Sequence, residues 1–171
     1  MAVGLIVQVA PAAAQYNRDD QGRRDRPSPA VSLLAGPSTY DLSGTGTAFN
    51  VAVRFDIPAG RRFIVEPGIG FFRYRTVFGT TIKYLLPEIS LQFEPTRGPV
   101  RPYVGVGAGF SEYLTGPGAS PATVHAVVGL RARVTRIYGF RTEVRLRGVD
   151  PFSGQQMTDV AFGLTKRLGA R

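Results

Sequence analysis

The chain has 171 residues, a net charge of +9 at pH 7 and no cysteine, so it suits one domain and excludes both a disulfide framework and a thiolate metal site. Its single histidine, His125, argues against a histidine-based metal site, and no run of about eighteen apolar residues predicts a transmembrane helix. The arginines are spread along the chain and not gathered in a block, which disfavours nucleic acid as a partner.

The N-terminal segment differs in composition from the rest. Residues 1–14 form an apolar run that ends in Ala12-Ala13-Ala14, which matches the cleavage pattern of a secretory signal peptide, although the basic n-region is missing and the signal would be truncated. A buried N-terminal strand is the alternative. Residues 15–29 are charged, of mixed sign and poor in apolar residues, so they predict a disordered tail. We expect the folded domain to span residues 30–171.

From residue 30 onward, runs in which apolar residues alternate with polar or small ones are separated by turn signals, as in β-strands. Eight such runs are predicted, over Ala30–Gly36 (with Tyr40 as the furthest end), Thr47–Ile57, Arg62–Arg75, Thr81–Glu94, Arg101–Leu114, Thr123–Val134, Phe140–Arg147 and Thr158–Leu168. Strands of globular proteins usually have about five or six residues, whereas a membrane-spanning strand needs about 9–11. The length of several runs therefore favours a barrel that crosses a membrane.

The connections between these runs fall into two groups. The long ones, polar or rich in glycine, are Pro37–Gly46, Thr115–Ala122 and Gly148–Gln156, and the tight ones are Pro58–Arg61, Pro95–Val100 and Thr135–Gly139. Long loops at one end and short turns at the other are typical of outer-membrane barrels. An even number of strands then places both chain ends on the short-turn, periplasmic side.

The run Phe140–Arg147 shows most clearly that the strands have two faces. One face carries Phe, Thr, Val and Leu, and the other carries Arg, Glu, Arg and Arg. A soluble sandwich would bury the apolar face, whereas a small membrane barrel turns it toward lipid, where an Arg at the midplane would cost roughly 2–4 kcal/mol. We therefore expect a structural charge network in the lumen, made of Arg54, Glu66, Glu88, Arg131, Arg133, Arg141, Glu143 and Arg145.

Glycine, proline and aromatic residues refine this prediction. The glycines at 105, 107 and 109 weaken a strand, and we expect them to relieve crowding inside a narrow barrel. Pro67 and Pro87 are awkward within central strands and predict local bulges. Tryptophan is absent, so an aromatic girdle would come from Tyr40, Tyr74, Tyr84, Tyr113, Phe78, Tyr138 and Phe140.

Three segments, Val65–Phe71, Arg101–Phe110 and Val160–Leu164, carry a resemblance to a known family, and Arg-Pro-Tyr-Val-Gly at 101–105 is its most specific part. Over residues 30–168 the chain resembles the small bacterial outer-membrane β-barrels of the OmpA-like and OmpX-like group. The resemblance implies an all-β fold, an eight-stranded antiparallel up-and-down transmembrane barrel. Its implied location is the outer membrane, reached by export and by insertion through the barrel-assembly machinery. The end of the chain, Leu168-Gly169-Ala170-Arg171, lacks the terminal aromatic that is usual in the family.

The predicted function is a structural or surface-interaction role for a monomeric barrel whose lumen is filled by side chains, with outer-membrane lipid or lipopolysaccharide as its partner. Some small barrels are lipid-modifying enzymes that use a histidine, a serine and an acid, and His125 could lie near Ser111 and Glu112. The rest of their motif is absent, so we expect no catalytic residue, cofactor or metal. A narrow, porin-like pore or small-ligand conduit and a soluble, exported, lipocalin-like lipid-binding barrel stay open as alternatives.

Overall fold

The computed structural model describes residues 28–40, 47–75, 81–114, 120–149 and 155–169. The predicted signal peptide and nearly all of the predicted tail lie outside these ranges. The elements are β1 (Ala30–Tyr40), β2 (Thr47–Pro58), β3 (Phe63–Arg75), β4 (Thr81–Phe93), β5 (Val100–Phe110), β6 (Glu112–Tyr113), β7 (Ala122–Arg133), β8 (Tyr138–Val149) and β9 (Gln155–Arg167). No helix in the described part of the chain is long and apolar enough to cross a membrane.

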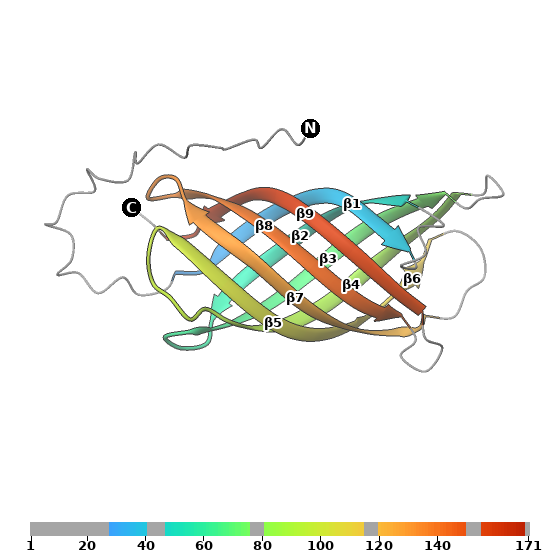
Figure 1. Ribbon diagram of the computed structural model, residues 1–171, viewed down its shortest axis with the longest axis horizontal. Coiled ribbons are helices and arrows are strands. Elements are labelled where there is room, and N and C mark those ends of the chain that lie inside the picture. Colours follow the sequence, from blue (N-terminus) through green and yellow to red (C-terminus); the bar gives the residue numbers. More distant parts are fainter. Residues whose placement is uncertain (1–27, 41–46, 76–80, 115–119, 150–154, 170–171) are drawn as a thin grey trace, which may run out of the picture.

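The strands form one closed antiparallel barrel, seen from the side in Figure 1. β1 to β5 pair in chain order, β5 pairs with β7, and β7, β8 and β9 again pair in chain order. The pairing of β1 with β9 closes the circle, so the sheet has no free edge. β6 continues the line of β5 along β4 in the same register, so the nine labelled strands make an eight-stranded barrel. The predicted fold is therefore confirmed.

The two ends of the barrel differ in their connections. Residues 59–62, 94–99 and 134–137 join strands at one end, which we call the turn end, and β1 begins and β9 finishes there, at the left of Figure 1. The opposite end is called the loop end, and the centres of its connections lie outside the described residues. β1 reaches Tyr40, the furthest end expected for it. β8 continues to Val149 and β9 begins at Gln155, both inside a predicted long loop, so the two groups of connections differ less in length than the sequence suggests.

The prediction of bulges at Pro67 and Pro87 is wrong. β3 pairs with β4 without a shift in register from Phe63–Phe93 to Arg75–Thr81. Each proline instead leaves a gap in one ladder, because proline has no N–H to donate. The β2–β3 pairing is interrupted opposite Pro67, and the pairing of β4 with β5 and β6 is interrupted at Pro87, beside the break between β5 and β6.

Burial alternates along the strands in the sense opposite to that of a soluble protein. The buried side chains include many charged groups, whereas large apolar side chains are exposed on the outer surface. Every long strand contributes to this apolar belt, for example through Leu33, Phe49, Ile69, Ile89, Val104, Val128, Leu146 and Leu164. The glycines of β5 lie where a side chain would not fit. A Cβ atom added to Gly107 would lie 2.3 Å from the carbonyl oxygen of Ile89 in the neighbouring strand. This crowding agrees with the expected role of the β5 glycines.

Candidate functional site

The half of the lumen nearer the turn end holds a cluster built around Glu66 and Glu143. Arg141 reaches both acids, with Nη1 2.5 Å from Glu66 Oε2 and Nη2 2.6 Å from Glu143 Oε2. Tyr103 lies between them, because its hydroxyl donates to Glu143 at 2.8 Å and accepts from Arg141 Nε at 2.9 Å. The guanidinium carbon of Arg131 lies 4.1 Å from the centre of the Tyr103 ring. Side chains of β5, β7 and β8 thus meet at Tyr103, and Arg141 joins Glu66 of β3 to them.

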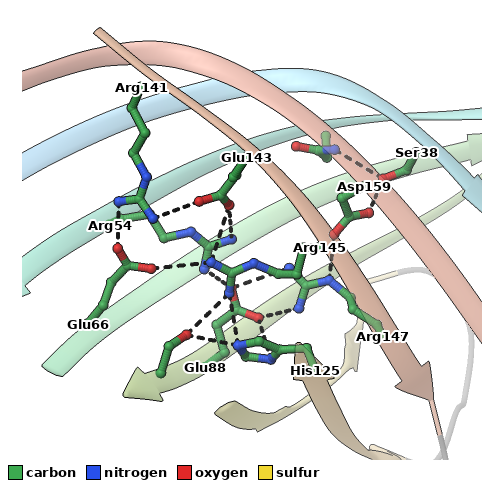
Figure 2. A network of polar contacts seen from close by, with 12 residues as sticks. Ser38, Arg54, Glu66, Glu88, His125, Arg141, Glu143, Arg145, Arg147 and Asp159 are labelled. Atoms are coloured by element: carbon green, nitrogen blue, oxygen red, sulfur yellow. Dashed lines mark hydrogen bonds and ion pairs between the residues drawn. The ribbon is translucent and has the colours of Figure 1, made fainter. Parts of the chain in front are cut away.

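A second cluster in the other half is centred on Glu88 of β4 (Figure 2). Its carboxylate contacts Arg54 and Arg147 and accepts from Arg145 Nη1 at 2.7 Å. Arg147 also donates through Nε to Asp159 Oδ2 at 2.5 Å, which fastens β8 to β9 inside the barrel. Side chains from strands on opposite walls therefore meet at one carboxylate.

Arg145 joins the two clusters. Its Nη2 atom lies 3.2 Å from Glu66 Oε1 and 3.2 Å from Glu143 Oε1, while its Nη1 atom is bound to the second cluster. Among the described residues, the acids buried in the lumen are Asp56, Glu66, Glu88, Glu94, Glu143 and Asp159, and the guanidinium groups paired with them are those of Arg54, Arg101, Arg131, Arg141, Arg145 and Arg147. The lumen is thus close to electrically neutral, the condition under which so many ions can be buried.

Seven of the eight residues predicted for the network, all except Arg133, have buried, inward-facing side chains. Arg133 is the last residue of β7 and is only half-buried. The prediction omitted Arg147, although it lies two residues beyond Arg145 and so shares its face. It also omitted Tyr103 and Glu94. The hydroxyl of Tyr103 bonds to Arg141 and Glu143 of β8, and these partners are known only once the strands are placed around the lumen.

An apolar cluster lies inside the barrel toward the loop end. Phe72, Tyr84, Leu86 and Met157 are buried there, with Tyr74, Ile82 and Tyr113 packed against them. The rings of Phe72 and Tyr84 are stacked, with their centroids 5.2 Å apart. The predicted girdle is therefore wrong for Tyr84, Tyr74 and Tyr113, which belong to this inner cluster. Tyr138 and Phe140 are exposed as predicted, and the side chains of Tyr40 and Phe78 lie outside the description.

His125 also faces the lumen, and its neighbours are not the ones considered from the sequence. Its Nε2 atom lies 2.8 Å from Ser90 Oγ, and its Nδ1 atom lies 3.5 Å from Glu88 Oε2. This is the order of a serine–histidine–acid triad, but Arg145 Nη1 lies 3.0 Å from the same Nε2 atom and can only donate to it. The lone pair that would take the serine proton is therefore already engaged, and all three side chains are buried.

Among the described residues, no group of three or more histidine, cysteine or acidic side chains is arranged to hold a metal ion. The lumen arginines pair with carboxylates of the protein itself. The arrangement is therefore suited to cross-linking the walls of the barrel, and the lumen offers no cluster for binding a metal among these residues.

Fold and lumen together define a class, the small eight-stranded membrane β-barrels with an apolar outer surface and a filled, charged interior. Solved structures agree. Neisserial surface protein A matches with 15% identity and a TM-score of 0.59, over 82% of this chain and 97% of that one. The outer membrane protein OprG from Pseudomonas aeruginosa matches with 14% identity and a TM-score of 0.57, over 82% and 96%. The outer membrane enzyme PagL matches with 11% identity and a TM-score of 0.56, over 81% and 99%.

No family model and no curated protein matches the sequence. At these identities the structural matches show the fold of small outer-membrane barrels, as the resemblance implied. They include both an enzyme and a surface protein, so they define an architecture and leave the role to be argued from the residues.

Proposed function

We propose that this protein is an outer-membrane β-barrel with a structural or surface-interaction role, whose lumen is closed by its own side chains. The observation that carries the proposal is the inverted distribution of polarity. Large apolar side chains such as Leu164 (65% exposed) and Val106 (63% exposed) cover the outside, while Arg141 and Arg145 are fully buried inside. Soluble monomers rarely expose apolar patches larger than a few hundred Å². A belt that runs around the whole barrel has a natural environment in lipid.

The contents of the lumen favour a closed barrel over a pore. An eight-stranded barrel is just wide enough for its own side chains to fill. Here the arginine–carboxylate network occupies the middle, and the apolar cluster around Phe72 and Tyr84 covers the loop end. We therefore propose that the barrel does not conduct ions, and that its contacts with other molecules are made by its surfaces. Catalysis is not part of the proposal, because the grouping around His125 is buried and its Nε2 atom is engaged.

The membrane assignment is tested by the behaviour of the purified chain. A membrane barrel requires detergent to stay monomeric, and its folded form migrates differently on a gel from the heated form. We expect both properties. A chain that remains monomeric without detergent would contradict the membrane assignment and favour the soluble, lipid-binding alternative.

The closed lumen is tested separately, by electrical recording across a planar bilayer that contains the folded barrel. We expect no single-channel steps at any applied voltage. Reproducible steps would favour the pore. Truncating Leu86 in the apolar cluster to alanine should not open a pore, because the charged network lies beneath it.

A further inference from the structure

The turn end of the barrel carries several exposed basic side chains. The exposed basic side chains there are those of Arg61, Arg62, Arg97, Arg136 and Lys166. The acid nearest to them in sequence, Glu94, faces the lumen and is held by Arg131 at 2.8 Å and by Arg101 at 2.9 Å. Among described residues the only exposed acid is Glu112, in β6 toward the loop end. The turn end thus presents a strongly basic surface.

Three of these arginines converge on one pocket between two neighbouring turns. Arg61 and Arg62 of the β2–β3 turn and Arg97 of the β4–β5 turn, with Phe63, line an open pocket of about 620 Å³. Arg97 Nη2 donates to the carbonyl oxygen of Arg61 at 3.0 Å, and the N–H of Glu94 donates to the carbonyl oxygen of Arg62 at 2.8 Å. These two bonds hold the turns together and fix the position of the pocket.

The sequence of the first turn places its two arginines side by side. Gly60 has a φ of 145°, a conformation that side-chain-bearing residues rarely adopt. The N–H of Ala59 donates to the carbonyl oxygen of Phe63 at 2.9 Å and closes the turn. Arg61 and Arg62 are therefore presented from a short, closed turn and not from a long loop.

One wall of the pocket is apolar and continues into the belt on the outside of the barrel. Phe63 is 48% exposed and packs against Phe93, with the ring centroids 5.3 Å apart. Leu91, the next outward-facing residue of β4, is also exposed. Outer-membrane barrels carry girdles of aromatic residues at both membrane interfaces. Arginine is well suited to bind phosphate because its planar guanidinium can donate two parallel hydrogen bonds. The pocket therefore matches a molecule with a phosphate at one end and hydrocarbon at the other.

We propose that this arginine pocket binds the headgroup of an anionic glycerophospholipid in the periplasmic leaflet. The phosphate lies among Arg61, Arg62 and Arg97, and the acyl chains follow Phe63 and the outer face of β3 and β4. The inference rests on the proposed insertion in the membrane. Beyond that insertion, it assigns a specific lipid contact to the turn end of the barrel.

The test is a titration of the folded barrel, in detergent, with three compounds, with bound molecules counted by native mass spectrometry. The compounds are phosphatidylglycerol, phosphatidylcholine with the same acyl chains, and glycerol 3-phosphate. We expect phosphatidylglycerol to bind more tightly than phosphatidylcholine, which carries no net charge. We expect no saturable binding of glycerol 3-phosphate, because it lacks the hydrocarbon that contacts Phe63.

Two double variants separate the pocket from the general charge of this end. R61Q/R62Q keeps the bond from Arg97, since its acceptor is a backbone oxygen. Each basic residue near an anionic lipid surface contributes roughly fivefold to the binding affinity. The loss of two should therefore weaken the binding of phosphatidylglycerol about 25-fold. R136Q/K166Q removes as many charges from other parts of the same end and should leave the affinity nearly unchanged.

Equal affinity for the two lipids, or an equal loss in both double variants, would overturn the proposal. Binding of glycerol 3-phosphate as tight as that of the lipid would instead identify a site for free phosphate, and would also overturn it. Each preparation is first checked for heat-modifiable migration. A folded barrel without lipid selectivity contradicts this inference alone, whereas a chain that stays monomeric without detergent contradicts the proposed function as well.

Discussion

Glu143 shows how much a single lumen residue contributes to the connection between strands. Its carboxylate accepts from Arg141 and from the hydroxyl of Tyr103, and it lies 3.2 Å from Arg145 Nη2. Each of these partners is buried. Breaking a buried ion pair by removing one partner leaves a charge uncompensated, which costs far more than the pair itself contributes.

Replacing Glu143 with leucine should therefore lower the free energy of unfolding by about 3–5 kcal/mol. Insertion should remain largely intact, because the lipid-facing surface is unchanged. The measurement is the urea unfolding midpoint of the barrel in detergent. Glu112→Leu is the control, since this acid is exposed and its loss should cost no more than about 0.5 kcal/mol. An unchanged midpoint for E143L would count against an interior charge network.

At the scale of the strand, the same alternation that encloses the charges exposes the apolar side chains. Val128 lies near the middle of β7 and is 55% exposed. It pairs with Val104 of β5 and Val144 of β8, so three neighbouring strands present a continuous apolar surface there. Val134 lies just beyond the end of the same strand, at the turn end, and is also exposed. Both positions are exposed, so the cost of placing a charge at each should differ because of their depth in the membrane.

An arginine at position 128 should destabilise the barrel in lipid vesicles by about 2–4 kcal/mol, whereas an arginine at position 134 should cost about 0–1 kcal/mol. The measurement is the free energy of folding into vesicles, by denaturant titration of V128R and V134R. Similar costs at the two positions would mean that β7 does not cross the membrane at the predicted depth.

At the scale of the whole molecule, the barrel has a direction. β1 begins and β9 finishes at the turn end, and most of the exposed basic side chains of the described residues lie there, although Arg73 and Lys83 lie toward the loop end. The lumen between the ends is close to neutral. Short turns face the periplasm in outer-membrane barrels. The proposed orientation therefore places Ala59, in a short turn, on the periplasmic side of the membrane. It places Ser120, which is exposed beside the loop end, at the cell surface.

Because the chain has no cysteine, a single introduced thiol reports this orientation directly. In intact cells, a membrane-impermeant maleimide should label Ser120→Cys and not Ala59→Cys. After the outer membrane is permeabilised, both should be labelled. Labelling of the A59C variant alone in intact cells would show that the barrel is inserted in the opposite direction.

The sequence was a good guide to whatever depends on the period of a strand. Two successive side chains point to opposite faces whatever the neighbours are, so the inward direction of Arg54, Glu88 and Arg141 followed from local alternation, as did the number of strands. The role of a single residue within a strand was harder to predict from the sequence. Tyr84 was expected in an outer girdle, although its even-numbered position shares the inward face of Glu88, because tyrosine suits both a girdle and a lumen. Pro87 was expected to form a bulge, whereas the fold accommodates it as a gap in one ladder.

The number of strands, their two faces and the inward direction of the charges were determined by the amino-acid order alone, since each depends only on residues a few positions apart. The partners of those charges were decided by the closed barrel. Arg145 of β8 donates to Glu88, and Arg97 donates to the carbonyl oxygen of Arg61. These contacts form because the closure of the barrel and the register of its strands place the partners at the same height along the barrel axis. Contacts across a lumen depend on the stagger of all the strands together, and no local pattern records that stagger.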